Sequence, residues 1–301
     1  MPLHFSKNEY QAREMNLILQ LEKKNIDALL IFRQESMYWL TGYDSFGYVF
    51  FQCLVFTKNR DKILLTRAPD LRQAQNTSNI RDIRIWIDQE GANPASYLKD
   101  ILKELKLEKK SIGVEYDSYG LTGRNALRLN KILEPFTYLS DQSYIISKLR
   151  LVKSKAEIQY VKKAAELADQ ALQKAWGLAH PGTDESEILA AMQGTIFQGG
   201  GDYPGNEFII GSGENALLCR YFSGRRKLDK IDQLTLEFAG VYRHYHSALM
   251  RTIPIGQAKT KHTHMHKICL EALLACESIL HEGITTGEVF DVYANIMDQS
   301  S

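Results

Sequence analysis

The chain has 301 residues, more than one ordinary domain needs, so two domains are expected. With 44% hydrophobic and 24% charged residues, its composition is that of a globular protein that buries a sizeable core. A net charge of +1 gives no electrostatic case for nucleic acid or an anionic membrane as a partner, and no apolar run approaches the roughly 20 residues that span a bilayer.

The first residues lack the basic start and apolar core of a secretory signal peptide. The four cysteines are scattered along the chain and form no CxxC pair. Few, dispersed thiols fit a reducing compartment, so we expect a cytoplasmic protein.

The N-terminal half alternates helical and strand-like segments. Ser6 and Glu9 have the spacing of a capping box, and apolar residues then recur at helical intervals up to Asn25. Further helices are expected at 94–105 and 121–133. The expected strands are 28–32, 48–56, 62–66, 83–87, 111–114 and 136–139. This alternation predicts an α/β domain that ends near Ser140.

The segment Trp39-Leu40-Thr41-Gly42-Tyr43 stands out in this half. Its aromatic residues either pack around a strand-to-loop turn, where Gly42 supplies backbone freedom, or contact a ligand. No glycine-rich phosphate loop occurs here, so the α/β pattern gives no reason to expect a nucleotide.

A second capping box, Ser154 to Glu157, opens a helix with one apolar stripe. We therefore place the domain boundary between Ser140 and Val152, with one domain at 1–145 and the other at 150–301. Asp184 can cap the next helix, which should run through Phe197. The glycine-rich stretch 199–205 that follows, which contains Tyr203, is a flexible lid or a long connector.

The segment 233–255 has two strand-like pieces, 233–237 and 250–255, with an aromatic and histidine-rich strand between them. Glu237 ends an apolar run, where a carboxylate is costly unless it is paired. It is either a nucleophile or general base at a pocket floor, or a buried acid held by a backbone amide or by Arg251. His244 and His246 lie two apart on a predicted strand and would share one face, where imidazole can transfer protons.

A last pair of helices is expected at about 262–280 and after Gly287. His262, His264 and His266 invite a metal interpretation, but His264 would point away from the other two on a helix. Solvent-exposed histidines on a helix face are the expected outcome.

Several motifs resemble those of the pita-bread hydrolases, which include aminopeptidase P, prolidase, methionine aminopeptidase and creatinase. They are Leu-Arg-Leu-Val-Lys-Ser at 149–154, Pro-Gly-Thr-x-Glu at 181–185, Gly-Ser-Gly-Glu-Asn at 211–215 and Arg-Thr at 251–252. The segment 39–43 is similar to a motif of creatinase-like N-terminal domains. The resemblance implies an α/β (α+β) protein, with a creatinase-like α/β domain followed by an incomplete pita-bread catalytic domain that should continue past Ser301.

In that family two aspartates about eleven residues apart hold a pair of divalent metals, and here Glu237 and Ala248 match them. An alanine cannot bind a metal, and creatinase, the metal-free member, also reads Ala-Leu-x-Arg-Thr at this place. A histidine that shuttles protons in the relatives matches Arg220, which cannot release a proton near neutral pH. Arg220 can hold a substrate carboxylate or a developing negative charge instead. The resemblance therefore implies a protein without metal or other cofactor.

Three hypotheses follow. The first is a metal-independent hydrolase of a C–N bond in a small nitrogenous compound, similar to creatinase. The second is a metal-dependent Xaa-Pro aminopeptidase or dipeptidase, and the third is an inactive shortened homologue or dimerising binding module. The expected partners are a small-molecule or short-peptide substrate and a second copy of the chain in a homodimer. The candidate catalytic residues are Glu237, His244 and His246, and the candidate substrate-binding residues are Arg220, Tyr221, Tyr203, Arg251 and Trp39.

Overall fold

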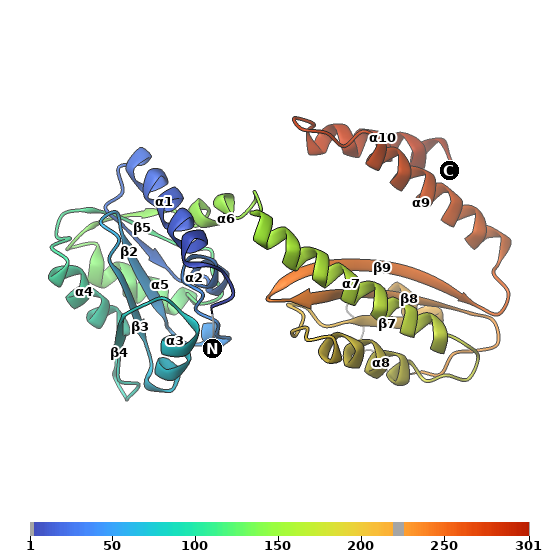
Figure 1. Ribbon diagram of the computed structural model, residues 1–301, viewed down its shortest axis with the longest axis horizontal. Helices are drawn as coiled ribbons and strands as arrows, with labels where there is room; N and C mark the ends of the chain where they lie inside the picture. The colour runs from blue at the N-terminus through green and yellow to red at the C-terminus, as the bar shows by residue number, and fades with distance from the viewer. Residues whose placement is uncertain (1–2, 219–225, 301) are drawn as a thin grey trace. The chain divides into compact units, whose positions relative to one another are not determined.

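The computed structural model describes residues 3–218 and 226–300. The chain divides into two compact units, Met1–Ala156 and Glu157–Ser301, which we call the N-terminal and the C-terminal unit (Figure 1). Arg220 and Tyr221, two of the predicted substrate-binding residues, lie outside the described residues.

The N-terminal unit is built on a six-stranded sheet with the strand order β4-β3-β2-β1-β5-β6. The strands are β1 (Ala28–Ile31), β2 (Cys53–Thr57), β3 (Lys62–Thr66), β4 (Asp82–Ile85), β5 (Ser111–Val114) and β6 (Tyr138–Asp141). β1, β5 and β6 are mutually parallel, as are β3 and β4, while β2 is antiparallel to both of its neighbours. The helices are α1 (Lys7–Lys23), α2 (Gln34–Thr41), α3 (Leu71–Thr77), α4 (Pro94–Glu104), α5 (Gly123–Leu133) and α6 (Ile145–Leu149).

Each face of this sheet has its own hydrophobic core, because successive side chains of a strand point to opposite faces. In β1, Leu30 belongs to the core that α4 and α5 complete, whereas Leu29 belongs to the core completed by α1, α2, α3 and α6. The strand is apolar throughout because both of its faces are buried, as is usual for parallel strands. The α/β class predicted for this half is confirmed.

Two local predictions in this unit are wrong. The segment 39–43 is the end of helix α2 and not a strand-to-loop turn, although the backbone freedom predicted for Gly42 is confirmed, since it ends the helix in a left-handed conformation (φ +83°). A turn of 3₁₀ helix at Gly47–Val49 replaces the first part of the predicted strand 48–56, so that β2 begins only at Cys53.

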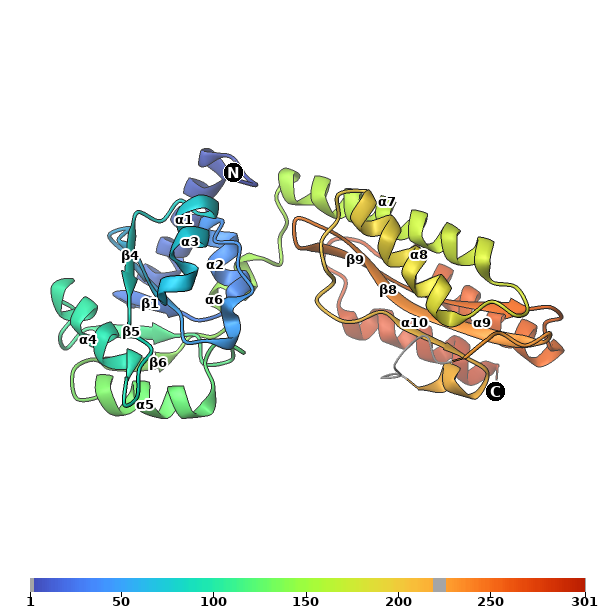
Figure 2. The same cartoon turned by 90° about the horizontal axis from the view of Figure 1, so that it is seen from below.

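The C-terminal unit contains a three-stranded antiparallel sheet in the order β7-β8-β9. Its elements are α7 (Lys155–Leu178), α8 (Glu185–Gln198), β7 (Ile209–Ser212), a 3₁₀ helix η3 (Gly213–Leu217), β8 (Asp232–Tyr242), β9 (Tyr245–Ile255), α9 (Thr260–Ser278) and α10 (Thr286–Gln299). α7 and α8 cover one face of the sheet, and α9 and α10 lie on its other side (Figures 1 and 2). His262, His264 and His266 are exposed on α9, as expected.

The covered face of this sheet is apolar and close-packed. Leu234, Leu236 and Phe238 of β8 share a core with side chains of α7 and α8. At Gly240, helix α7 approaches β8 so closely that an added Cβ would lie 2.0 Å from the carbonyl oxygen of Ala164. The opposite face, which carries Glu237, Ala239 and Val241 on β8 and His246, Ala248 and Met250 on β9, is called the open face below.

The segment 233–255 forms two long strands rather than the three pieces predicted. Arg243 and His244 form the two-residue turn between β8 and β9, with φ values of +50° and +64°. Both values are positive, as a type I′ turn requires. The prediction that His244 and His246 share a strand face is therefore wrong, because His244 lies in the turn.

None of the described helices is both long enough and apolar enough to cross a membrane.

Candidate functional site

Glu237 lies in the middle of β8 and points to the open face, because Leu236 and Phe238 on either side of it are buried on the helix-covered face. Its side chain is half-buried. Among the described residues none forms a hydrogen bond or ion pair with its carboxylate. The alternative of a buried acid held by an amide or by Arg251 finds no support in the described part of the chain.

Arg251 lies opposite Leu236 in the strand register and therefore belongs to the other face of the sheet from Glu237. Its side chain is exposed, and Nη1 donates a hydrogen bond to the carbonyl oxygen of Met250 at 2.8 Å. The sheet itself thus separates the guanidinium from the carboxylate that it was expected to neutralise.

The strand register also locates positions 237 and 248, which match the two metal-binding aspartates of the pita-bread hydrolases. Met250 lies directly opposite Glu237, and Ala248 is the diagonal neighbour on the same face. Side chains at such diagonal positions are within reach of each other, so a carboxylate at 248 could share a cation with Glu237. A methyl group at 248 and the soft thioether of Met250 offer no hard oxygen ligand.

Within residues 3–218 and 226–300, no group of three or more His, Cys, Asp or Glu side chains is placed to hold a metal ion. The donor set around Glu237 that the structure describes therefore does not fit a dinuclear metal centre.

His246 uses both ring nitrogens in hydrogen bonds. Nδ1 lies 2.9 Å from the carbonyl oxygen of His244, and Nε2 lies 2.8 Å from the backbone nitrogen of Gly205. A carbonyl can only accept and an amide can only donate, so the ring is neutral with its proton on Nδ1. His246 is four residues from Met250 along β9, which places it about 13 Å from Glu237 at ~3.3 Å per residue. Glu237 and His246 are therefore too far apart for both side chains to contact the atoms of one scissile bond.

The remaining predicted site residues are dispersed. Tyr203 is 81% exposed, and its ring packs edge-on against Phe197 with centroids 4.8 Å apart. Trp39 is only 5% exposed in the core of the N-terminal unit, where the Arg13 guanidinium lies 5.1 Å from its ring. This burial does not favour the substrate contact predicted for Trp39.

A buried network that the sequence did not reveal supports the end of β7. Glu185 is fully buried and accepts hydrogen bonds from the backbone nitrogen (2.8 Å) and hydroxyl (2.6 Å) of Ser212. Arg226 donates to the Ser212 hydroxyl and pairs with Asp232 at the start of β8. The Pro-Gly-Thr-x-Glu motif contains Glu185 and was the available signal, but its spacing suggested only a helix start at Asp184. Asp184 does cap α8, by accepting from Ser186 N at 2.9 Å.

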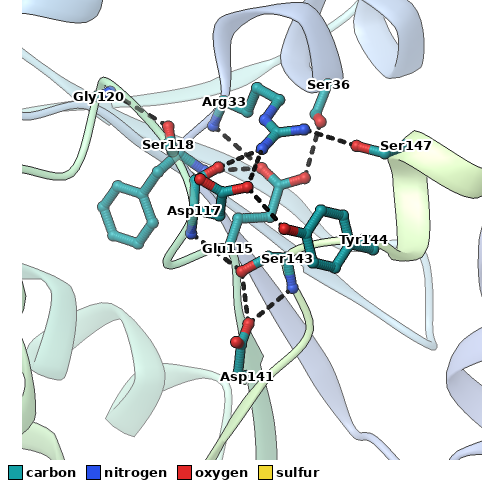
Figure 3. A network of polar contacts seen from close by, with 11 residues as sticks. Arg33, Ser36, Glu115, Asp117, Ser118, Gly120, Asp141, Ser143, Tyr144 and Ser147 are labelled. Atoms are coloured by element: carbon teal, nitrogen blue, oxygen red, sulfur yellow. Dashed lines mark hydrogen bonds and ion pairs between the residues drawn. The ribbon is translucent and has the colours of Figure 1, made fainter.

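A second network lies at the carboxyl ends of β1, β5 and β6 in the N-terminal unit (Figure 3). The carboxylate of Glu115, fully buried, accepts hydrogen bonds from the backbone nitrogens of Phe32 (3.1 Å) and Arg33 (3.0 Å) and from the Ser36 hydroxyl (2.7 Å). Burial raises the pKa of Glu115 to about 7, although these hydrogen bonds and the charge of Arg33 act in the opposite direction. The network holds the start of α2 against the sheet.

Comparisons with known proteins match both units. Residues 159–300 match the model of metallopeptidase family M24, and residues 13–152 match the creatinase/prolidase N-terminal domain. The ectoine hydrolase of Halomonas elongata is 23% identical over 99% of this chain and 78% of its own length. The Xaa-Pro dipeptidase of Pyrococcus horikoshii is 25% identical over 92% of this chain and 74% of its own length.

Solved structures show the same fold. The prolidase from Thermococcus sibiricus aligns with a TM-score of 0.84 and 22% identity, covering 96% of this chain and 77% of that one. The X-Pro aminopeptidase from Thermotoga maritima aligns with a TM-score of 0.82 and 20% identity, covering 95% of this chain and 77% of that one.

Proposed function

The chain belongs to metallopeptidase family M24, a family of hydrolases that act on C–N bonds, and has a creatinase/prolidase N-terminal domain. On this basis we propose that it hydrolyses a C–N bond of a small nitrogenous compound or short peptide, and that it does so without a pair of metal ions bridged by carboxylates. Glu237 is the proposed catalytic carboxylate. The observation that carries the proposal is Ala248, a methyl group at the diagonal position where a second carboxylate would be needed to share a cation with Glu237.

Glu237 has the properties that a general base or nucleophile requires. It is half-buried, on the open face, and unpaired among the described residues, so a substrate or a water can reach its oxygens. As a general base, the carboxylate takes a proton from water while the water oxygen bonds to the carbonyl or amidine carbon. The protonated Glu237 then returns the proton to the nitrogen as the C–N bond breaks, which leaves the carboxylate as it began.

His244 and His246 do not transfer protons at Glu237 in this proposal, although their spacing in the sequence suggested that role. His246 is held in its neutral form about 13 Å along the strands from Glu237. His244 lies beyond it in the turn, so neither is placed to pass a proton to a nitrogen held at Glu237. Arg220, Tyr221 and Tyr203 remain proposed substrate contacts.

A metal-dependent Xaa-Pro peptidase is the second candidate function. The names of the Pyrococcus horikoshii and Thermotoga maritima relatives favour it, whereas Ala248 opposes it. A non-catalytic binding module is the third. We further propose that the chain is cytoplasmic and forms a homodimer. Light scattering of the purified protein tests the homodimer directly.

The deciding experiment combines metal analysis with turnover. The chain, purified without chelator, is analysed for manganese, cobalt and zinc and assayed against amidines, lactams, amides and Xaa-Pro dipeptides. We expect less than stoichiometric metal and turnover that survives chelation. Glu237→Gln should abolish this turnover, while Glu271→Gln, which removes an exposed carboxylate from α9, should leave it unchanged.

Stoichiometric metal with chelator-sensitive cleavage of Xaa-Pro dipeptides would establish the second candidate instead. Undiminished turnover by Glu237→Gln would remove Glu237 from the mechanism. A folded protein that converts no compound of the panel would favour the binding module.

A further inference from the structure

Val241 is buried where the rest of its sheet face is open. Gly240 faces α7, so Val241 and its cross-strand partner His246 face the other side. Val241 is nevertheless 0% exposed, whereas Ala248 and Met250 farther along the same face are exposed. The open face is therefore covered at the end nearest the β8–β9 turn.

The glycine-rich stretch 199–205, called the glycine loop below, lies at this end of the open face. It leaves α8 with a bond from Gly201 N to the Ile196 carbonyl (2.9 Å) and reaches β8 with a bond from Asp202 N to the Val241 carbonyl (3.1 Å). Gly205 N then reaches His246 Nε2 on β9 at 2.8 Å. The chain after α8 thus passes close to the hairpin tip (Figure 2), and its hydrogen bonds lead it from α8 past Val241 to His246 on the open face.

The backbone of the glycine loop lies close to neighbouring atoms at both Gly201 and Gly205. An added Cβ at Gly201 would lie 2.6 Å from Ile196 Cγ2 and 2.7 Å from the Val241 carbonyl oxygen, so a side chain there would force the loop away. At Gly205 an added Cβ would lie 3.4 Å from His246 Nε2. Asp202 adds a third attachment by accepting a hydrogen bond from the backbone nitrogen of His244 at 3.1 Å.

His246 is the side chain that fastens the open-face end of this loop. The bond from its Nδ1 to the His244 carbonyl fixes the tautomer, and the fixed tautomer leaves Nε2 as an acceptor for Gly205. The other two bonds between the loop and the hairpin are both at Asp202, nearer α8. Without His246 the segment after Asp202, including Tyr203, would lose its bond to β9.

We propose that His246 is a positioning residue that holds the glycine loop across the open face as an end wall for the substrate. The wall crosses the face at Val241, four residues from Glu237, or about 13 Å at ~3.3 Å per residue. This inference rests on the proposed function at Glu237 and specifies its substrate class. Compounds that extend up to about four extended residues from Glu237 toward the hairpin tip are accommodated, and longer ones meet the loop.

The first test reads the hydrogen bond directly and needs no substrate. Long-range ¹H–¹⁵N correlation spectra of the full chain, labelled with ¹⁵N-histidine, distinguish the two neutral tautomers. The His246 signals are assigned by their absence in His246→Gln. We expect a neutral ring with the proton on Nδ1, and a proton on Nε2 would overturn the proposal because Nε2 could not accept from Gly205.

The second test measures the loop. Hydrogen–deuterium exchange of peptides within 199–207 is compared among wild type, His246→Ala, His246→Gln and His262→Gln, the last removing an exposed histidine from α9. Loss of one hydrogen bond should raise exchange about fivefold in His246→Ala. Gln retains an acceptor near the Nε2 position and should restore protection, and His262→Gln should match wild type. Unchanged exchange in His246→Ala would contradict the proposal.

The third test connects the wall to selectivity. In a series of compounds of increasing length that wild type hydrolyses, His246→Ala should raise kcat/KM for long members relative to short ones, and His246→Gln should restore the wild-type ratio. An unchanged ratio would contradict the end wall. If wild type hydrolyses nothing, the proposed function fails, and the tautomer and exchange measurements still decide the attachment of the loop.

Discussion

The buried carboxyl of Glu115 should make the stability of the N-terminal unit fall as pH rises. Its pKa is about 7 in the folded protein against an ordinary value of 4.5, so between these pH values the folded chain holds a proton that the unfolded chain has released. Folding then takes up a proton, and the free energy of unfolding decreases with pH by 1.36 kcal/mol per pH unit. Summed from pH 4.5 to 7, this group contributes about 3 kcal/mol, present in acid and lost above neutrality.

Glu115→Gln isolates this contribution. The amide oxygen can accept from Phe32 N and Arg33 N, and the amide nitrogen can donate to the Ser36 hydroxyl, so the contacts of the neutral acid are reproduced. Urea unfolding is followed by tryptophan fluorescence at intervals from pH 5 to 8.5. Trp39 and Trp86 are buried in the N-terminal unit, whereas Trp176, the third tryptophan, is 55% exposed on α7. Most of the change in tryptophan fluorescence should therefore report unfolding of the N-terminal unit.

We expect the wild type to lose about 3 kcal/mol more than the variant across this range, so that the variant is the more stable protein at pH 8. Glu108→Gln, which removes an exposed carboxylate from the same unit, should retain the wild-type pH dependence. Parallel curves for wild type and Glu115→Gln would refute the raised pKa.

Three further predictions concern the β8–β9 hairpin. Gly240→Ala should destabilise the C-terminal unit by about 2 kcal/mol in urea unfolding, because the new methyl group meets the Ala164 carbonyl oxygen. The control Gly177→Ala in α7, where an added Cβ has nothing within 4 Å, should stabilise the unit slightly. Replacing Arg243-His244 by Asn-Gly should raise the unfolding free energy by about 1 kcal/mol, because these residues suit positive φ; a loss of stability would mean that the native side chains have compensating contacts. Ala248→Asp should create manganese binding measurable by calorimetry that wild type lacks, and equal binding by both would contradict the role given to Ala248.

Much of the fold could be predicted because local signals agreed with the final packing. Lys62–Thr66 and Ser111–Val114 are strands with the predicted bounds, since both are short apolar runs between polar turns. Helix α2 was missed because its eight residues are nearly all buried, so they show no alternation of apolar and polar faces. The turn at Arg243-His244 was missed because neither residue carries the usual sequence signal for positive φ.

The candidate site could be predicted only in part. Glu237 was found because a charge in an apolar run is conspicuous. Strand register decides what surrounds it, and register depends on the length of β8 and the position of the turn, which the sequence did not reveal. Once the turn is at 243–244, Arg251 falls on the far face and His246 about 13 Å away along the strand. Glu185 and Glu115 escaped notice because their partners are backbone amides and hydroxyls distant in sequence.

The separate cores of the two units have a practical consequence for denaturation experiments. Each unit has its own set of buried apolar side chains, so we expect each to unfold with its own melting temperature. We expect two calorimetric transitions: the one that depends on Glu115 should shift to lower temperature as the pH rises from 5 to 8.5, and the other should respond to Gly240→Ala. Stabilising one half of the molecule therefore need not protect the other from heat.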